Sequence, residues 1–94
     1  MLGLYYFRWG GTPKEFKEYI GRVMSICEGT EGVDFKGVFV PSSEWNAVLL
    51  LEGPSLDKGI SVMKTYIQCY GPHPKIPVAK LELLFTYEEL GYPQ

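Results

Sequence analysis

His73 is the only histidine of the chain and the side chain best suited to proton transfer, because imidazole titrates near neutral pH. Pro72 and Pro74 flank it and restrict the backbone on both sides. Tyr66 and Tyr70 precede it, one turn apart in a predicted helix, and a phenol can polarise a substrate carbonyl. His73, Tyr66 and Tyr70 are therefore the candidate catalytic residues. The alternative interpretation is an exposed loop histidine with no chemical role.

An aromatic run near the start of the chain contains Tyr5, Tyr6, Phe7 and Trp9. Aromatic side chains can wall a cavity for a flat organic molecule, so Tyr6, Arg8 and Trp9 are the candidate ligand-binding residues. The same run also fits a simple core and dimer interface, since aromatic residues dominate both. Both faces of this predicted strand are apolar. The sequence leaves open which face would line a pocket: the face with Tyr6 and Arg8, or the face with Tyr5, Phe7 and Trp9.

Arg8 is the one charged residue of this strand, and three environments suit it. It can point inward and pair with Glu52 or Glu82. It can also hold a substrate carboxylate. The third possibility is an arginine at the end of a strand that extends to water.

The composition excludes several classes of function. A net charge of −2 over 94 residues gives no general attraction for nucleic acid or anionic membranes. No apolar run approaches the roughly 20 residues of a membrane span, and we expect no signal peptide and a cytoplasmic location. One histidine and scattered carboxylates give no metal-ligand spacing, so neither a metal nor a cofactor is predicted.

Cys27 and Cys69 lie far apart in the sequence and form neither a disulfide framework nor a Cys-x-x-Cys motif. We expect two buried, unreactive thiols. The alternative is a redox pair, because roughly parallel helices would place both cysteines near the same end of the molecule.

Local signals predict six elements. Thr12-Pro13 and Glu15 form a capping box that begins a helix, Ser55 can cap a second helix, and Gly71 ends it. Apolar residues repeat with the helical period in both predicted helices, and they alternate with other residues in the predicted strand 33–41. The predicted strands are 2–9, 33–41, 45–52 and 78–87, and the predicted helices are 12–29 and 55–71. In the strand 33–41, alternation places Val33, Phe35, Gly37 and Phe39 on one face and Asp34, Lys36, Val38 and Val40 on the other.

The order strand, helix, strand, strand, helix, strand predicts a single ferredoxin-like α+β domain over residues 1–94. Its four-stranded antiparallel sheet would carry both helices on one face. The other face is also apolar, and burying it would drive association into a homodimer or a higher homo-oligomer. Leu90 and Tyr92, in the short tail, could pack on a neighbouring subunit.

The segment 44–55, EWNAVLLLEGPS, resembles the dimeric α+β barrel proteins, in particular the GYD-type and related small barrel families. In them a turn leads into an apolar strand that ends in an acid, a small residue and proline. The family turn usually reads Gly-Tyr-Asp, whereas this chain has Glu44-Trp45-Asn46. The resemblance implies a dimer that packs sheet against sheet. In some members a histidine near the end of the second helix, the position of His73, acts as a base or metal ligand.

Two functions are consistent with these features. The first is a small homodimeric barrel protein that binds an apolar or aromatic molecule, or serves as an assembly or regulatory module. It predicts a filled core and a solvent-exposed His73. The second is a cofactor-independent monooxygenase, cyclase or isomerase that uses His73 and a tyrosine. It predicts a cavity of roughly 300 Å³ or more that His73 or Arg8 faces. The charge and the apolar open face disfavour an RNA-binding module.

Overall fold

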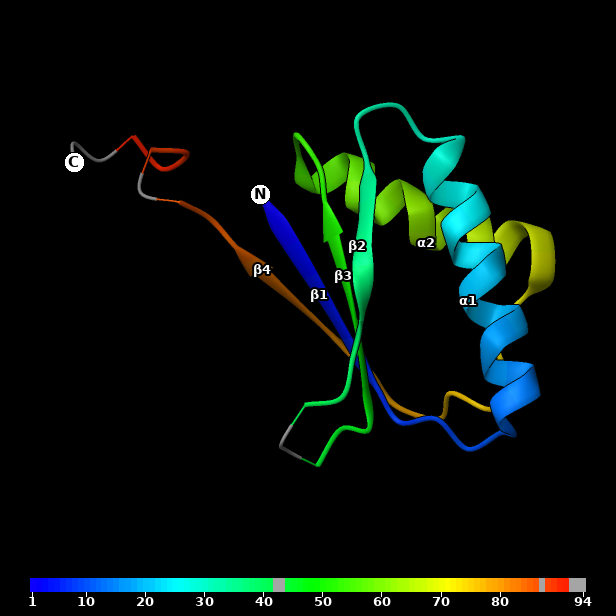
Figure 1. The fold of residues 1–94 in the computed structure, drawn as a ribbon. Helices are drawn as coiled ribbons and strands as arrows, with labels where there is room; N and C mark the ends of the chain where they lie inside the picture. The colour runs from blue at the N-terminus through cyan, green and yellow to red at the C-terminus, as the bar shows by residue number, and fades with distance from the viewer. Residues whose placement is uncertain (42–43, 87, 92–94) are drawn as a thin grey trace.

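The computed structural model describes residues 1–41, 44–86 and 88–91, and its element order confirms the predicted fold class (Figure 1). Each element lies inside its predicted range. The predicted end of the last strand, Tyr87, lies outside the described residues. The elements are β1 (Leu2–Phe7), α1 (Pro13–Glu28), β2 (Asp34–Phe39), β3 (Ala47–Glu52), α2 (Leu56–Tyr70) and β4 (Ala79–Leu84).

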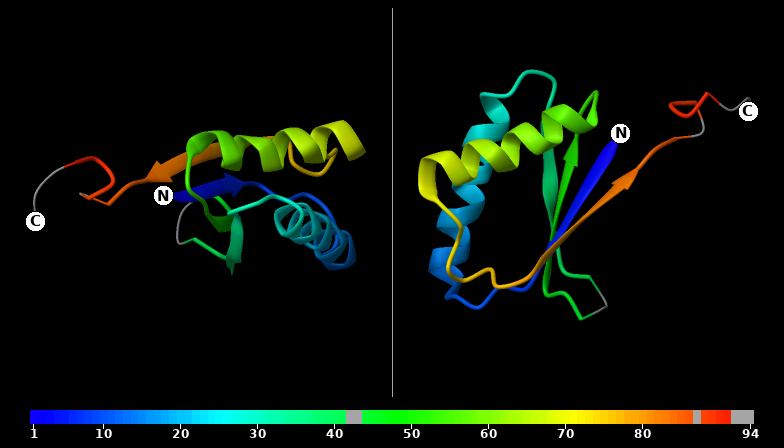
Figure 2. Two further views of the ribbon diagram at one scale, coloured as in Figure 1. Left: turned by 90° about the horizontal axis from the view of Figure 1, so that it is seen from above. Right: turned by 180° about the vertical axis from the view of Figure 1, so that it is seen from behind.

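The four strands form one sheet in the order β2-β3-β1-β4, and all neighbouring strands are antiparallel. This is the ferredoxin-like arrangement. Both helices lie on one side of the sheet, and they cross each other instead of running side by side (Figures 1 and 2). The expectation of parallel helices is therefore wrong. The strands that lead into the two helices, β1 and β3, are antiparallel. The chain therefore runs in opposite directions along the sheet in α1 and α2.

Short-range hydrogen bonds fix the helix ends, as the sequence predicts. The Thr12 hydroxyl accepts the Glu15 N–H at 3.2 Å, and the Glu15 carboxylate accepts the Thr12 N–H at 3.1 Å. The Ser55 hydroxyl accepts the Lys58 N–H at 3.4 Å at the start of α2. Gly71, with φ of 74°, ends α2 in a conformation that other residues rarely adopt.

The core lies between the sheet and the helices. Tyr5 and Phe7 of β1 face the helices and pack on the core with Leu49 of β3. This settles the orientation of β1, because Tyr6 between them must then point to the opposite face. The largest fully buried side chains are Phe7, Tyr19, Val23, Leu49 and Val62.

A bulge in β2 overturns the predicted alternation of that strand. The register shifts between Phe35 and Gly37, so Lys36 has no partner in the ladder. Phe35 and Val38 consequently both pack against the core, while Phe39 is 51% exposed. Gly37 permits the bulge because its φ is 152°.

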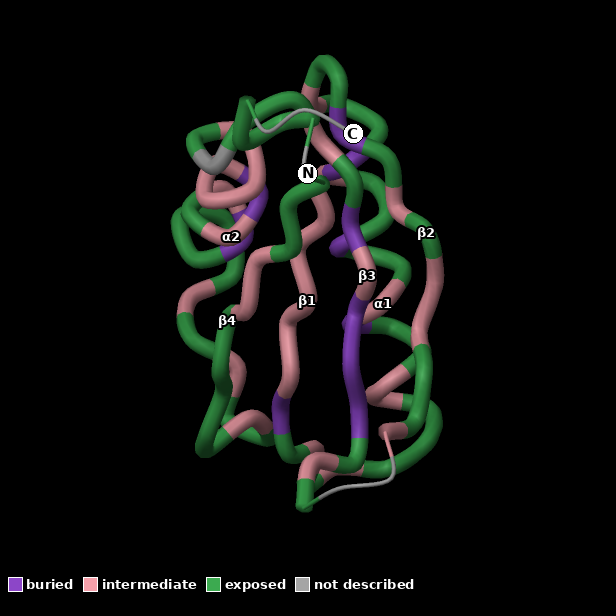
Figure 3. Tube along the Cα trace, turned by 90° about the vertical axis from the view of Figure 1, so that its left-hand side faces the viewer, coloured by how far each residue is buried: buried purple, intermediate pink, exposed green. Residues whose placement is uncertain are grey.

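No described element of the chain covers the face of the sheet opposite the helices, which we call the open face (Figure 3). Leu2, Leu4 and Tyr6 of β1 lie beside Val48 and Leu50 of β3 at its centre. These residues are partly or largely buried by their neighbours, whereas the edge strands are mostly exposed. Charged residues of this face lie on the edge strands or at strand ends, among them Asp34, Glu52, Lys80 and Glu82.

The segment after β4 leaves the body of the molecule (Figures 1 and 2). It gives the chain a long, flat outline, with principal extents of 46 × 31 × 17 Å. Leu90 is 55% exposed there. Tyr92, the other predicted contact residue, lies outside the described residues. No helix among the described residues has the length and apolar character that a membrane span requires.

Replacing Gly21 with alanine in α1 is expected to raise the free energy of unfolding by about 1 kcal/mol, because alanine favours the helix. Nothing lies within 4 Å of the added methyl group. Gly32→Ala is the contrasting control: Gly32 has φ of 82°, and a Cβ there would lie 3.2 Å from the Pro54 ring. This variant should lose stability. Urea unfolding measures both changes, and a less stable Gly21→Ala variant would contradict a continuous α1.

Candidate functional site

The loop between α2 and β4 brings His73 against the end of β1. The Gly10 N–H donates to the Lys75 carbonyl at 2.8 Å, and the Arg8 N–H donates to the Val78 carbonyl at 3.2 Å. These bonds attach the second half of the proline-rich loop, at Lys75 and Val78, to the residues that follow β1. His73, two residues before Lys75, is half-buried instead of fully exposed.

Asn46 holds Trp9 in place next to this loop. The Trp9 N–H donates to the Asn46 side-chain oxygen at 2.7 Å, and the Asn46 amide donates back to the Trp9 carbonyl at 3.1 Å. The indole N–H also donates to the Thr12 carbonyl at 3.3 Å. Gly11 is required here, since a Cβ would lie 2.9 Å from the indole ring. Sequence reasoning gave Asn46 no role in the site, because its partner Trp9 lies 37 positions away in the chain.

Tyr19 lies at the centre of an aromatic cluster around His73. Its ring centre is 5.3 Å from His73, 5.9 Å from Trp9 and 5.1 Å from Tyr66. The ring centres of Trp9 and His73 are 4.9 Å apart, and those of Tyr66 and Tyr70 are 5.1 Å apart. The structure therefore brings together the predicted residues His73, Tyr66, Tyr70 and Trp9.

Sequence reasoning also missed Tyr19, although a signal for it existed. The helical period in the sequence predicts a buried stripe of Phe16, Ile20, Val23 and Cys27 on this helix. The fully buried residues of α1 are Tyr19, Val23 and Cys27, which recur every four residues. Phe16 and Ile20 are only partly buried.

A cavity of about 250 Å³ lies beside this cluster, between α2, the proline-rich loop and strands β1 and β4; we call it the His73 cavity. Its walls are aromatic and aliphatic. The lining residues are Tyr5, Tyr19, Met63, Tyr66, Ile67, Pro72, His73, Ile76, Pro77 and Ala79.

A second pocket of about 250 Å³ lies toward α1 and shares Tyr19, Tyr66, Pro72 and His73 with the first. It is more polar, because charged residues and Tyr70 complete its walls. Tyr70 lines this pocket and not the His73 cavity. The additional residues are Glu15, Glu18, Arg22, Tyr70 and Pro74.

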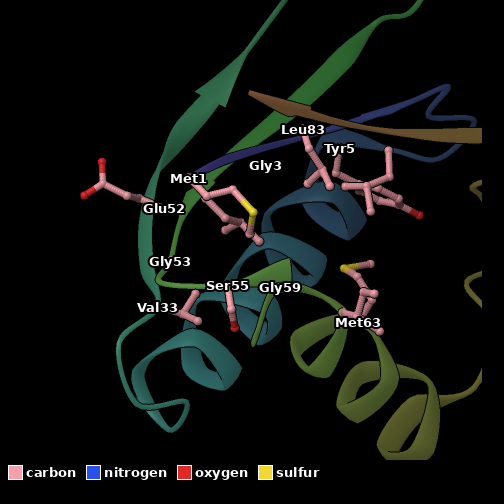
Figure 4. Close-up of a pocket in the computed structure, with 13 residues that line it drawn as sticks. Met1, Gly3, Tyr5, Val33, Glu52, Gly53, Ser55, Gly59, Met63 and Leu83 are labelled. Carbon is pink, nitrogen blue, oxygen red and sulfur yellow. The ribbon is translucent and has the colours of Figure 1, made fainter. Parts of the chain in front are cut away.

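A much smaller apolar cavity of about 30 Å³ lies between the start of α2 and the sheet (Figure 4). This volume is far below the several hundred Å³ that an organic ligand needs. Tyr5 and Met63 line both this cavity and the His73 cavity, so they separate the two. The Tyr5 hydroxyl points away from Met1 and Gly3 (Figure 4).

Hydrogen bonding fixes the form of the neutral His73 ring. Its Nδ1 accepts the Lys75 N–H at 3.0 Å, so the proton of the neutral imidazole resides on Nε2. Burial and the nearby Arg22 guanidinium lower the pKa of His73, Glu15 opposes this effect, and Lys75 adds a smaller lowering. At neutral pH His73 is consequently a neutral hydrogen-bond donor through Nε2. Acting as a base at Nδ1 would require it to break the bond to Lys75.

Tyr6 and Arg8 do not join Trp9 near the His73 cavity. Tyr6 lies on the open face with Lys80 5.7 Å from its ring centre. Arg8 is exposed and pairs with Glu44 at 3.2 Å, not with the expected Glu52 or Glu82. The three predicted ligand-binding residues therefore divide between two sides of the sheet.

Both cysteines are free, and their surroundings differ. Cys27 is buried, and burial raises the pKa of its thiol to about 11, which makes it unreactive. Cys69 is exposed, contrary to the expectation that both are buried. It lies beside Tyr70, whose ring packs 4.5 Å from the Arg22 guanidinium, over the middle of α1. Cys27 belongs to the last turn of α1, so the two thiols do not share one end of the helix pair.

The described residues contain no group of three or more His, Cys, Asp or Glu side chains that could hold a metal ion. The chain matches no protein-family model, and no curated protein is significantly similar to it. The fold and the geometry of the site therefore carry the functional argument.

The environment of His73 predicts opposite effects of two neighbouring charges. The His73 pKa is expected to lie below 6.5, the value for an unperturbed histidine. Arg22→Gln should raise it by removing a repelling cation, and Glu15→Gln should lower it further by removing an attracting anion. A proton NMR titration measures this directly, because the chain has only one histidine. Shifts of the same sign in both variants would contradict the geometry.

The lowered pKa also predicts a pH dependence of stability. Between the pKa of folded His73 and about 6.5, the unfolded chain binds a proton that the folded chain does not. The free energy of unfolding should therefore fall as the pH is lowered through this window. His73→Gln should remove that part of the pH dependence.

Proposed function

We propose that the protein is a homodimer of the dimeric α+β barrel type that binds one small apolar or aromatic molecule in each His73 cavity. The observation that carries the proposal is the cavity itself, with a volume of about 250 Å³ and aromatic and aliphatic walls. This cavity and the half-buried His73 replace the filled core and the exposed His73 expected of a non-catalytic protein, and the volume is below the roughly 300 Å³ expected of the enzyme. The size of the cavity is close to the lower end of known ligand pockets.

The open face supports the dimer. Its central residues, among them Leu4 and Leu50, are apolar and lie side by side. Four strands about 4.8 Å apart, with six residues of about 3.3 Å each, give the face an area of roughly 400 Å². A second copy of the same chain offers a matching apolar face, and a two-fold axis would bury both together.

The segment after β4 can supply further contact area. A stable interface usually buries about 800 Å² per partner, more than the open face provides by itself. Phe85 and Leu90 are exposed on a segment that leaves the body of its own subunit (Figure 1). In the proposed dimer this segment packs on the partner.

Leu50→Glu is expected to dissociate the dimer, because a charge at the centre of the open face would be buried without a partner. Met24→Glu is the matched control, since Met24 is an exposed apolar residue of α1 on the other side of the molecule. Sedimentation velocity measures the mass of each variant. A monomeric wild-type protein, or a dimer that both variants keep, would contradict the proposed interface.

Ligand binding is testable with 4-nitrotoluene, a flat probe with one apolar end. We expect saturable binding, one molecule per subunit, that shifts the His73 ring protons in NMR spectra. Ala79→Phe puts a large side chain in the wall of the cavity and should weaken binding by about tenfold or more. Val78→Phe, one residue outside the wall, should leave it unchanged. The absence of any saturable shift in the wild-type protein would contradict the proposal.

A cofactor-independent enzyme is the second candidate, and the shared position of His73 and Tyr66 in one cavity favours it. The bond from the Lys75 N–H to Nδ1 limits what His73 can do. It could polarise a carbonyl as a donor through Nε2 more readily than it could remove a proton.

A further inference from the structure

We propose that the hydroxyl groups of Tyr5, Tyr19 and Tyr66 form a hydrogen-bond donor site for a single ligand oxygen, which defines the ligand as a planar phenolate, enolate or conjugated carbonyl compound. This inference rests on the proposed function, because it names the ligand class of the His73 cavity. It assigns the site to residues that lie on three separate elements.

The three tyrosines converge on the His73 cavity from β1, α1 and α2. The rings of Tyr19 and Tyr66 meet edge to face, with their centres 5.1 Å apart. The Tyr5 hydroxyl points away from the small apolar cavity beside Met1 (Figure 4). Since Tyr5 lines both cavities, this orientation directs its hydroxyl toward the His73 cavity.

Two of these tyrosines are almost fully buried, yet their hydroxyls have no hydrogen-bond partner among the described residues. Tyr19 is 1% exposed and Tyr66 is 3% exposed. Neither hydroxyl forms a hydrogen bond to another described residue. However, no polar side-chain atom in the described part of the chain is both fully enclosed and unpartnered. The little accessible surface of Tyr19 and Tyr66 must therefore include the hydroxyl groups. Both residues line the His73 cavity and also the second pocket beside it, so the hydroxyls are accessible where these two pockets meet the cluster. Buried hydroxyls are normally paired, so these are available to a ligand.

The electrostatics of the cluster favour neutral donors. Burial raises the pKa of Tyr19, and the neighbouring Tyr5 and Tyr66 raise it further. Burial also raises the pKa of Tyr5. The phenols of Tyr5 and Tyr19 consequently stay protonated at neutral pH. A negatively charged oxygen placed among them would accept charge-assisted hydrogen bonds, which are stronger than neutral ones.

The remaining walls narrow the ligand class. No lysine or arginine lines the His73 cavity, so a phosphate or a localised carboxylate would lack a counter-charge. An oxygen whose charge is spread over a flat ring system suits these walls better. Ile67, Ile76 and Pro77 would contact the ring, and Nε2–H of His73 offers another donor in the wall.

The test compares 4-nitrophenol with 4-nitrotoluene, which has the same shape without the oxygen. The wild-type protein should bind the phenolate form preferentially, and the absorbance of the phenolate should show a lowered pKa of the bound probe. Tyr19→Phe and Tyr66→Phe keep the ring packing and remove a donor. Each should weaken phenolate binding by about tenfold or more and leave 4-nitrotoluene binding unchanged.

Tyr70→Phe is the matched control, because Tyr70 packs on Tyr66 but does not line the His73 cavity. It should leave the binding of both probes unchanged. If 4-nitrotoluene binds the wild-type protein, two results would overturn the donor site alone. The first is phenolate binding that is not weakened in Tyr19→Phe and Tyr66→Phe, and the second is a bound 4-nitrophenol whose pKa is not lowered. If neither probe binds to the wild-type protein, the proposed function fails together with this inference.

Discussion

The packing of Tyr19 is the contact on which the arrangement of this molecule depends. Its ring touches Phe7 from the sheet, Tyr66 from α2, and His73 and Trp9 from the two loops. One fully buried side chain thus joins the sheet, both helices and the proline-rich loop. Aromatic pairs of this kind stabilise beyond the area that they bury. Removing the ring would leave a space that several elements border, and His73 would keep only Trp9 as an aromatic neighbour among the described residues.

The orientation of β1 follows from the same core and separates two surfaces. Tyr5 and Phe7 point to the helices, and Tyr6 points to the open face. The strand is buried on its helix side and apolar on its other side. Two crossing helices cover only the first of these sides. The chain therefore has a partly open cavity on the helix side of β1 and an apolar face on its other side.

Local signals made the fold predictable, whereas long-range contacts decided the site. The Thr12 capping box and the Gly71 helix end depend on residues a few positions apart, and both are as expected. The bulge at Lys36 reversed the faces of the residues after it, which no alternation pattern could anticipate. The pairing of Arg8 with Glu44 and the bonds of Asn46 to Trp9 join residues more than 30 positions apart. Such contacts depend on strand register and are not encoded in spacing.

Alternation along β1 makes the two proposed properties separable. Tyr5 lines the His73 cavity, and Leu4 and Tyr6, on either side of it in sequence, belong to the open face. A substitution at either neighbour changes the sheet face without changing the cavity wall. A ligand that orders Tyr5 nevertheless acts on the strand whose opposite side would meet the partner subunit. Ligand binding and dimerisation therefore involve different side chains but the same backbone, and any coupling between them must pass through β1.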